Sequence, residues 1–146
     1  MSSAVAILVK CMQLSFVKKI YLDKIISILL RIVFSFQVSP GITTGTNVRF
    51  GYGGLGTVIH GSTVIGSNVT IGSNVTIGGN FGKGGVPTLE DDCYIATGAK
   101  LFGPITIGRG SIVGANSVVT TSVPPYTLVS GIPAVVVKEL NQETST

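Results

Sequence analysis

The sequence has no tryptophan, only one histidine and few charged side chains, which make up 11% of the 146 residues. So little charge, with 45% hydrophobic residues, excludes a disordered and highly charged chain. The two cysteines, Cys11 and Cys93, lie far apart without CxxC spacing. They predict a reducing compartment and neither a disulfide nor a zinc site. A metal centre that needs three imidazole ligands is excluded as well.

Positive charge is confined to the N-terminal part of the chain. Residues 1–40 carry a net charge of +4, from Lys10, Lys18, Lys19, Lys24 and Arg31 against Asp23. The remaining residues sum to zero, so the body has no basic face for nucleic acid. Lysines interrupt the N-terminal apolar run and no small-residue cleavage site follows it. We therefore expect neither a signal peptide nor a transmembrane span, and a cytoplasmic protein.

Glycine, in contrast, is abundant, with 20 residues, and the stretch HGSTVIGSNVTIGSNVTIGGN at 60–80 repeats nearly the same hexad three times. Aliphatic residues recur every six positions, with one register missing at Lys83: Ile59, Ile65, Ile71, Ile77, Leu89, Ile95, Leu101, Ile107, Val113 and Val119. This period predicts short strands joined by tight turns. Three such strands close one triangular coil of a β-solenoid.

Stacked coils of this kind lie about 4.8 Å apart, so each inward aliphatic side chain should pack on the residue 18 positions later. The predicted columns are Ile59, Ile77, Ile95 and Val113; Ile65, Leu101 and Val119; and Ile71, Leu89 and Ile107. In this register the slot that follows each aliphatic residue places Gly78, Ala96 and Gly114 above His60. We expect a groove of minimal side chains there.

Three segments are expected: an N-terminal helical segment at 1–38, the β-solenoid at 39–125 and a C-terminal extension at 126–146. Within the first, residues 4–36 are basic and apolar, which predicts one or two helices. These helices either pack on the body or contact a membrane surface on its cytoplasmic side. The glycine-rich stretch at 78–88 is expected to replace one face of a coil.

The stretches VIGSNVTIGSNVTIGGN, IGRGSIVGANSVV and VPPYTLVSGIPAVVV resemble the hexapeptide-repeat acyltransferases, most closely the serine acetyltransferase-like branch. The resemblance covers roughly residues 38–138. It implies a mainly β fold, a left-handed parallel β-helix, assembled as a homotrimer. It also implies that acetyl-CoA, the acetyl donor, binds between subunits. From the cysteine spacing and the single histidine we expect no metal.

The function that we predict is acetyl-CoA-dependent O-acetylation of a hydroxyl on a sugar or polysaccharide precursor. Serine is the alternative acceptor. We rank it second because serine acetyltransferases carry a longer N-terminal helical domain than this sequence contains. A non-catalytic β-helix scaffold is the other alternative. A γ-carbonic-anhydrase-like metalloenzyme is set aside, since one histidine cannot supply three ligands.

Two residues are candidates for catalysis. A hydroxyl that attacks a thioester must lose its proton, and His60 is the natural acceptor near neutral pH. Tyr52 is the second candidate, because related acetyltransferases often carry their catalytic histidine in a stretch resembling FGYGGLG, where this chain has Tyr52. Tyr52 could replace part of that role, and a packing role is the alternative. A second histidine, expected just before Pro87, is Val86 here.

The remaining candidates concern binding. Gly78, Ala96 and Gly114 would leave room for the pantetheine arm of acetyl-CoA. Lys83 could meet the CoA phosphates, and Lys138 joins this cofactor-binding set, whereas Asn80 and Phe81 would wall the substrate groove. The loop that holds Lys83 could also be a tolerated insertion. The motif GYGGLG at 51–56 fits GxGxxG, but repeats rather than a helix follow it, so no dinucleotide site is expected.

Overall fold

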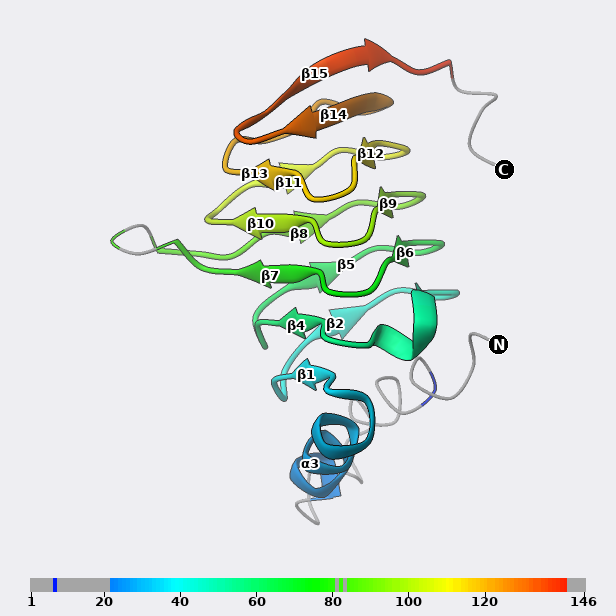
Figure 1. The fold of residues 1–146 in the computed structure, drawn as a ribbon, viewed down its shortest axis with the longest axis vertical. Coiled ribbons are helices and arrows are strands. Elements are labelled where there is room, and N and C mark those ends of the chain that lie inside the picture. The colour runs from blue at the N-terminus through cyan, green and yellow to red at the C-terminus, as the bar shows by residue number, and fades with distance from the viewer. Residues whose placement is uncertain (1–6, 8–21, 81, 83, 142–146) are drawn as a thin grey trace.

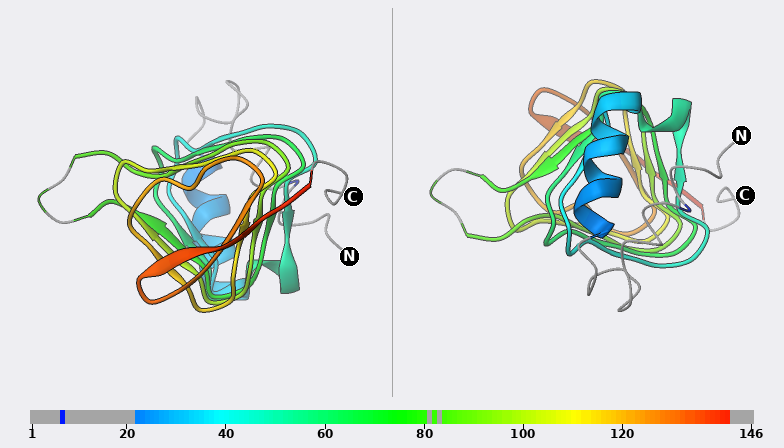
Figure 2. Two further views of the ribbon diagram at one scale, coloured as in Figure 1. Left: turned by 90° about the horizontal axis from the view of Figure 1, so that it is seen from above. Right: turned by 90° about the horizontal axis from the view of Figure 1, so that it is seen from below.

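A computed structural model describes residues 7, 22–80, 82 and 84–141 of the chain. Within these residues the chain forms a short helix and then a stack of triangular coils (Figures 1 and 2). The elements are α3 (Leu22–Phe34), β1 (Gln37–Val38), β2 (Thr43–Thr44), β3 (Arg49–Phe50), the 3₁₀ segment η1 (Gly51–Gly54), β4 (Val58–Ile59), β5 (Val64–Ile65), β6 (Thr70–Ile71), β7 (Thr76–Gly78), β8 (Thr88–Leu89), β9 (Tyr94–Ile95), β10 (Lys100–Phe102), β11 (Thr106–Ile107), β12 (Ile112–Val113), β13 (Val118–Val119), β14 (Thr127–Gly131) and β15 (Ala134–Glu139).

The strands form three sheets, which are the three faces of a triangular prism. Face A has the order β1-β4-β7-β10-β13, face B has β2-β5-β8-β11, and face C has β3-β6-β9-β12-β14-β15. Neighbouring strands are parallel except for the closing pair β14 and β15. The predicted fold class, a mainly β solenoid of parallel strands with a short helix before it, is confirmed. The stack already includes β1 at residue 37 and extends through β14 beyond residue 125.

The hexad explains why this stack holds together. In each short strand the first residue faces outward and the second is buried, as in β5, where Val64 is 43% exposed and Ile65 is 1% exposed. Each fully buried aliphatic side chain contributes about 1.5–3 kcal/mol to folding. The small residues that follow at the corners, such as Val69, Val75 and Ala99, are also fully buried. The prism is therefore filled by its own repeats.

The predicted register is correct within each half of the stack but wrong across the stretch 78–88. Ile59 pairs with Ile77 as predicted, but Ile77 pairs with Leu101 instead of Ile95. In the same way, the structure forms the pairs Ile65–Leu89 and Ile71–Ile95. The glycine-rich loop does not replace a face of the coil. It is inserted at the corner between β7 and β8, so all three faces continue and the coil gains six residues.

The first coil is longer as well, and the motif GYGGLG is the reason. Val38 pairs with Ile59, 21 positions later, because η1 adds residues at the corner between faces C and A. Tyr52 and Gly53 take left-handed φ angles of 49° and 67° there. The ring of Phe36 packs so closely under Gly54 that a side chain at this position would collide with it. The motif is thus a corner of the solenoid, and β4 follows it.

Helix α3 lies across the lower end of the prism and covers it (Figures 1 and 2). Leu30 is fully buried, and Ile26 and Phe34 pack against the same core. The hydroxyl of Ser27 donates to the carbonyl oxygen of Val38 at 2.9 Å, which ties the helix to β1. The rest of the predicted helical segment up to residue 21, including Cys11, lies outside the described residues. Over the described part of the chain, no helix is long and apolar enough to cross a membrane.

Candidate active site

His60 follows β4 at the corner between faces A and B, and its side chain is exposed. The backbone N–H of Ser62 donates to Nδ1 of His60 at 3.1 Å. Because a backbone N–H can only donate, Nδ1 must present its lone pair, and in the neutral ring Nε2 carries the proton. The ring nitrogen left free for solvent is therefore Nε2, which is a hydrogen-bond donor. In this tautomer His60 can accept a proton only at Nδ1. The hydrogen bond from Ser62 must therefore break before the proton is taken up.

The column above His60 differs from the predicted one beyond its first member. The backbone N–H of His60 donates to the carbonyl of Ile77 at 2.9 Å, which places Gly78 over His60 as predicted. Phe102 comes next, because β10 pairs with β7. A Cβ atom added at Gly78 would have no neighbour within 4 Å, so this position borders open space.

Ala96 and Gly114 do not lie above His60, because the loop shifts the register. They lie at the corner between faces C and A, stacked with Gly51 and Gly72. The residue next to Gly51 is Tyr52, whose side chain is 85% exposed. The predicted column is therefore wrong beyond Gly78: Ala96 and Gly114 belong to a different column of small residues, and Gly51 with its neighbour Tyr52, not His60, lies at the foot of that column.

Close stacking of the coils accounts for the glycines in this column. A Cβ atom at Gly72 would lie 2.6 Å from the backbone nitrogen of Thr97, and one at Gly114 would lie 2.6 Å from Oγ of Ser130. Real Cβ atoms essentially never approach so closely. These two positions require glycine whether or not a ligand binds, which distinguishes them from Gly78.

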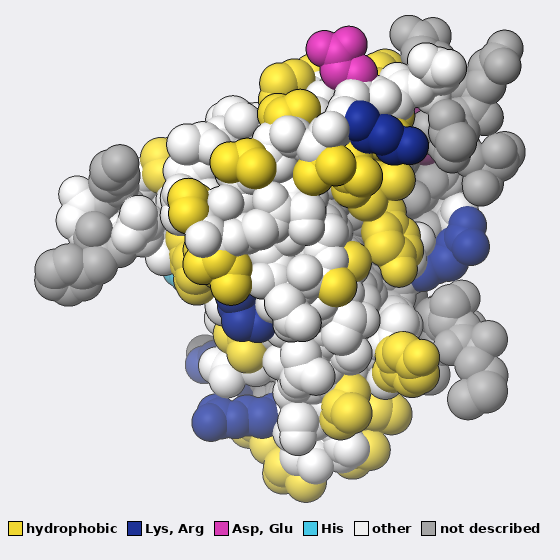
Figure 3. All heavy atoms as spheres, turned by 45° about the horizontal axis from the view of Figure 1, so that its top comes forward, with side chains coloured by type: hydrophobic (Ala, Val, Ile, Leu, Met, Phe, Trp, Pro, Cys, Tyr) yellow, Lys and Arg dark blue, Asp and Glu magenta, His cyan; other side chains and the backbone are white. Residues whose placement is uncertain are grey.

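The other predicted binding residues are spread over the molecule. Asn80 is exposed at the base of the loop, which projects sideways from the prism (Figures 1 and 3). Phe81 and Lys83 lie outside the described residues. Lys138 is in β15 at the upper end, paired with Leu128, and is not next to His60. Among the described residues no cluster of three His, Cys, Asp or Glu side chains could hold a metal.

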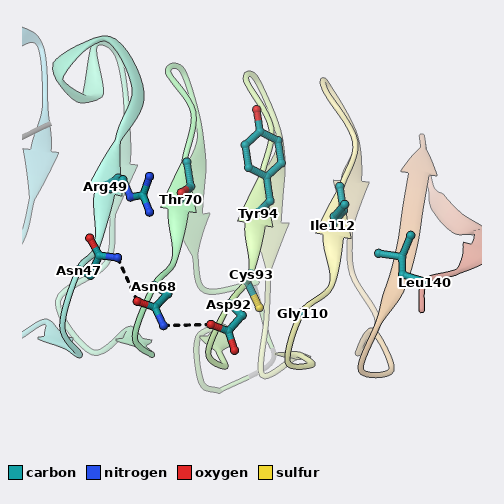
Figure 4. A pocket seen from close by; sticks show the side chains of 10 residues that line it. All are labelled: Asn47, Arg49, Asn68, Thr70, Asp92, Cys93, Tyr94, Gly110, Ile112 and Leu140. Carbon is teal, nitrogen blue, oxygen red and sulfur yellow. Dashed lines mark hydrogen bonds between the residues drawn. The ribbon is translucent and has the colours of Figure 1, made fainter. Parts of the chain in front are cut away.

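Sequence reasoning missed a polar ladder along the corner between faces B and C (Figure 4). Nδ2 of Asn47 donates to Oδ1 of Asn68 at 3.0 Å, and Nδ2 of Asn68 donates to Oδ1 of Asp92 at 3.0 Å. All three residues have left-handed φ angles, from 54° to 61°. Asn and Asp tolerate this conformation, which explains their choice at the corner. Only the turn role of the asparagines is visible in the sequence.

Next to this ladder, the pKa values of Asp91 and Cys93 are shifted in opposite directions, each for a different reason. The backbone N–H of Ser67, at 2.8 Å from Oδ1, and then the guanidinium of Arg109 lower the pKa of Asp91. Burial raises the pKa of Cys93 to about 12. Because the thiolate is the reactive form, this shift disfavours a nucleophilic role for Cys93 near neutral pH.

Face C also carries an open groove of about 530 Å³ beside the ladder (Figure 4). Arg49, Thr70, Tyr94 and Ile112, the outward residues of four successive strands, form its floor, and Leu140 lines its upper end. Neither His60 nor Tyr52 lines this groove. It is therefore separate from both candidate catalytic residues.

Comparisons with known proteins identify similar chains. Serine acetyltransferase from Bacillus subtilis is 43% identical over 120 residues, which are 80% of this chain and 54% of the relative. The Staphylococcus xylosus serine acetyltransferase is 41% identical over 125 residues, 84% of this chain and 57% of the relative. The chain thus spans a little more than half the length of these curated relatives. No family model matches the chain.

Solved structures agree with these relatives. Soybean serine acetyltransferase complexed with serine superposes with a TM-score of 0.74 at 37% identity, over 80% of this chain and 48% of that one. Serine acetyltransferase from Brucella abortus in complex with coenzyme A has a TM-score of 0.79 at 27% identity, over 86% and 52%.

The parallel three-sided solenoid, its hexads and these similarities define the class of the protein as a hexapeptide-repeat, left-handed parallel β-helix, the fold of the similar acetyltransferases. Within this class, the chain is similar to the serine acetyltransferase-like branch, over at least 80% of its own length and about half of theirs.

Proposed function

We propose that the protein is an acetyl-CoA-dependent O-acetyltransferase whose acceptor is serine. The observation that supports this most is the similarity of its β-helix to serine acetyltransferases, one complexed with serine and another with coenzyme A. The sugar hydroxyl predicted from the sequence has no comparable support, so we now place it second. Substrate would bind at an edge of face A, where His60 and Tyr52 lie at opposite corners.

In the proposed reaction, the serine hydroxyl oxygen attacks the carbonyl carbon of the thioester. The carbon–sulfur bond breaks, an ester forms, and the hydroxyl proton passes by way of a protein base to the CoA sulfur. His60 is the only imidazole in the sequence and remains the proposed proton acceptor. Its bond from Ser62 gives it a fixed orientation and must be released when the proton is taken up.

Two edges of face A can hold the acetyl-CoA arm. Open space at Gly78 supports the edge of His60, whereas the exposed Tyr52 beside the small residue Ala96 is what supports the other edge. A homotrimer would bring the two edges of neighbouring subunits together and would give the projecting loop a surface to contact. We therefore propose a trimer, which mass measurement in solution tests.

A non-catalytic scaffold remains the second candidate function. The specific observation in its favour is that the lone pair of Nδ1 is already engaged by Ser62. In addition, the residues that follow in the column above His60, Gly78 and Phe102, have no acid or base group. A scaffold would bind partners through the β-helix without turning over acetyl-CoA.

The test is an acetyl-transfer assay with serine, amino sugars and oligosaccharides as acceptors. His60→Ala should lower turnover with serine by about 10²- to 10⁴-fold, the usual contribution of a positioned acid or base. Tyr52→Phe, the matched variant on the opposite edge, should have a smaller effect. The reverse order would assign the chemistry to Tyr52. Absence of transfer to every acceptor would support the scaffold.

A binding experiment separates the two edges. Gly78→Val should weaken acetyl-CoA binding if the arm lies beside His60, and Ala96→Val should weaken it if the arm lies above Tyr52. Gly78 ends strand β7 of face A, and Ala96 directly follows strand β9 of face C. Neither substitution removes a charged group. Calorimetric titration of each variant, with a thermal melt to confirm folding, measures the difference.

A further inference from the structure

Helix α3 is apolar on two opposite sides, and the β-helix uses only one of them. The inner side, formed by Ile26, Leu30 and Phe34, covers the end of the prism. The outer side keeps five large aliphatic side chains exposed to between 53% and 75%: Ile25, Ile28, Leu29, Ile32 and Val33. An exposed apolar area of this kind on a short helix marks an interaction site.

The exposed residues form one continuous stripe. Ile25, Ile28, Leu29 and Ile32 are spaced by three and four positions, so they follow one another along the same side of the helix. This side is turned away from Leu30, which is fully buried. Packing of the β-helix therefore does not explain the stripe.

Basic residues border the stripe. Lys24 and Arg31 are exposed and seven positions apart, which places them on one side of the helix, next to Ile28. Figure 3 shows basic side chains beside hydrophobic ones at the lower end of the molecule. The sequence of residues 1–40 carries a net charge of +4, whereas the remainder sums to zero. The apolar stripe thus lies in the one positively charged part of the chain.

The position of α3 places its outer side at the lower end of the molecule. The helix lies across the lower end of the prism, whereas the strands β14 and β15 close the upper end (Figures 1 and 2). The loop after β7 projects sideways rather than downward. A helix of 13 residues is about 20 Å long, too short to cross the hydrocarbon core of a bilayer.

We propose that the outer side of α3 binds an anionic lipid surface and holds the β-helix upright on it. An amphipathic helix whose apolar stripe has a basic border lies in the lipid interface, where apolar burial and attraction to anionic headgroups act together. A second copy of the chain is the less favourable occupant, because pairing two α3 helices brings Lys24 and Arg31 of both copies together. This inference does not depend on the acetyl-transfer activity.

The experiment is co-sedimentation of the full chain with vesicles of phosphatidylcholine, alone or mixed with phosphatidylglycerol. The protein should sediment with the anionic vesicles, and added salt should weaken this binding. Ile28→Ser combined with Ile32→Ser should weaken it at least about tenfold, since two large apolar side chains leave the interface. Arg31→Gln should weaken binding to the anionic vesicles and should leave binding to pure phosphatidylcholine vesicles unchanged.

The matched control is Val135→Ser combined with Val137→Ser, which removes two exposed valines from β15 at the opposite end. This variant should bind vesicles like the original protein. Thermal melts should show all variants folded, because none of the substituted side chains is buried. Equal binding by the Ile28/Ile32 variant would overturn the proposal. The proposal would also fail if the original protein bound no vesicles and the Ile28/Ile32 variant formed a smaller oligomer than the original protein. A second copy of the chain would then cover the stripe.

Discussion

The backbone N–H of Ser62 donates to Nδ1 of His60 at 3.1 Å, and this bond determines which nitrogen of the ring faces solvent. His60 is exposed, so a rotation about its side-chain bonds would otherwise leave either nitrogen outward. The bond is local, spanning two residues at one corner of the coil, and needs no partner subunit. It links the geometry of the turn directly to the chemistry available at this site.

We therefore expect neutral His60 to be the tautomer with the proton on Nε2. Long-range proton–nitrogen correlation spectra distinguish the two tautomers, and the assignment is unambiguous because the chain has one histidine. A spectrum dominated by the Nδ1–H tautomer would show that the bond from Ser62 does not persist in solution. In that case the exposed nitrogen would be free to act as a base without any rearrangement.

The second prediction compares two glycines that follow a buried isoleucine. Gly72→Val should destabilise the fold by about 1–3 kcal/mol, because its Cβ would meet the backbone of Thr97 at 2.6 Å. Gly78→Val should leave the stability nearly unchanged, since the same atom at this position has no neighbour within 4 Å. Urea unfolding measures both values. Equal destabilisation would mean that the open space beside Gly78 is closed in solution.

The sequence predicted the fold well because the hexad determines each side chain's direction. The period alone identified Ile65, Ile77 and Leu101 as inward residues, and all three are buried. The pairing of Ile77 with Leu101 was not predictable in the same way. Closing a longer loop costs little extra free energy, so the period resumes after a corner insertion just as it does after a skipped face. Only the three-dimensional pairing tells these two cases apart.

The candidate site was less predictable for the same reason. An error of one hexad in register moves a residue to a different corner of the triangle, as it did for Ala96 and Gly114. His60 and Gly78 precede the loop, so their relationship was predicted correctly. The ladder through Asn68 and Asp92 depends on contacts between coils, 24 positions apart, that no local pattern reveals.

Cys93 should be protected from thiol reagents in the folded protein. Burial raises its pKa to about 12, and the side chain is 2% exposed, so both the thiolate and access to it are scarce. In a Cys11→Ser variant, an aromatic disulfide reagent near neutral pH should modify Cys93 only after denaturation. Rapid modification of the native variant would contradict the buried position of this thiol.

The last prediction concerns acid stability at the corner formed by Asp91 and Arg109. The pKa of Asp91 is lowered in the folded protein, first by the N–H of Ser67 and then by Arg109. A carboxylate with a lowered pKa stabilises the fold above its unfolded pKa of about 3.9, and this contribution is lost as the pH falls through the folded value. The melting temperature of the native protein should therefore decrease on acidification below about pH 4.

Variants of this corner should reproduce the order of the two causes. Asp91→Asn should flatten the acid limb of the melting curve, because the group that titrates is gone. Arg109→Gln should flatten it less, since the hydrogen bond from Ser67 remains and the side chains of the ion pair are 51% and 39% exposed to solvent. Added salt screens the ion pair and not the backbone hydrogen bond, so it should flatten the acid limb only as much as Arg109→Gln does.

Glu139→Gln, on the exposed strand β15, is the control and should leave the limb unchanged. If Arg109→Gln flattened the limb as much as Asp91→Asn, the ion pair rather than the backbone bond would dominate the acid stability of this corner.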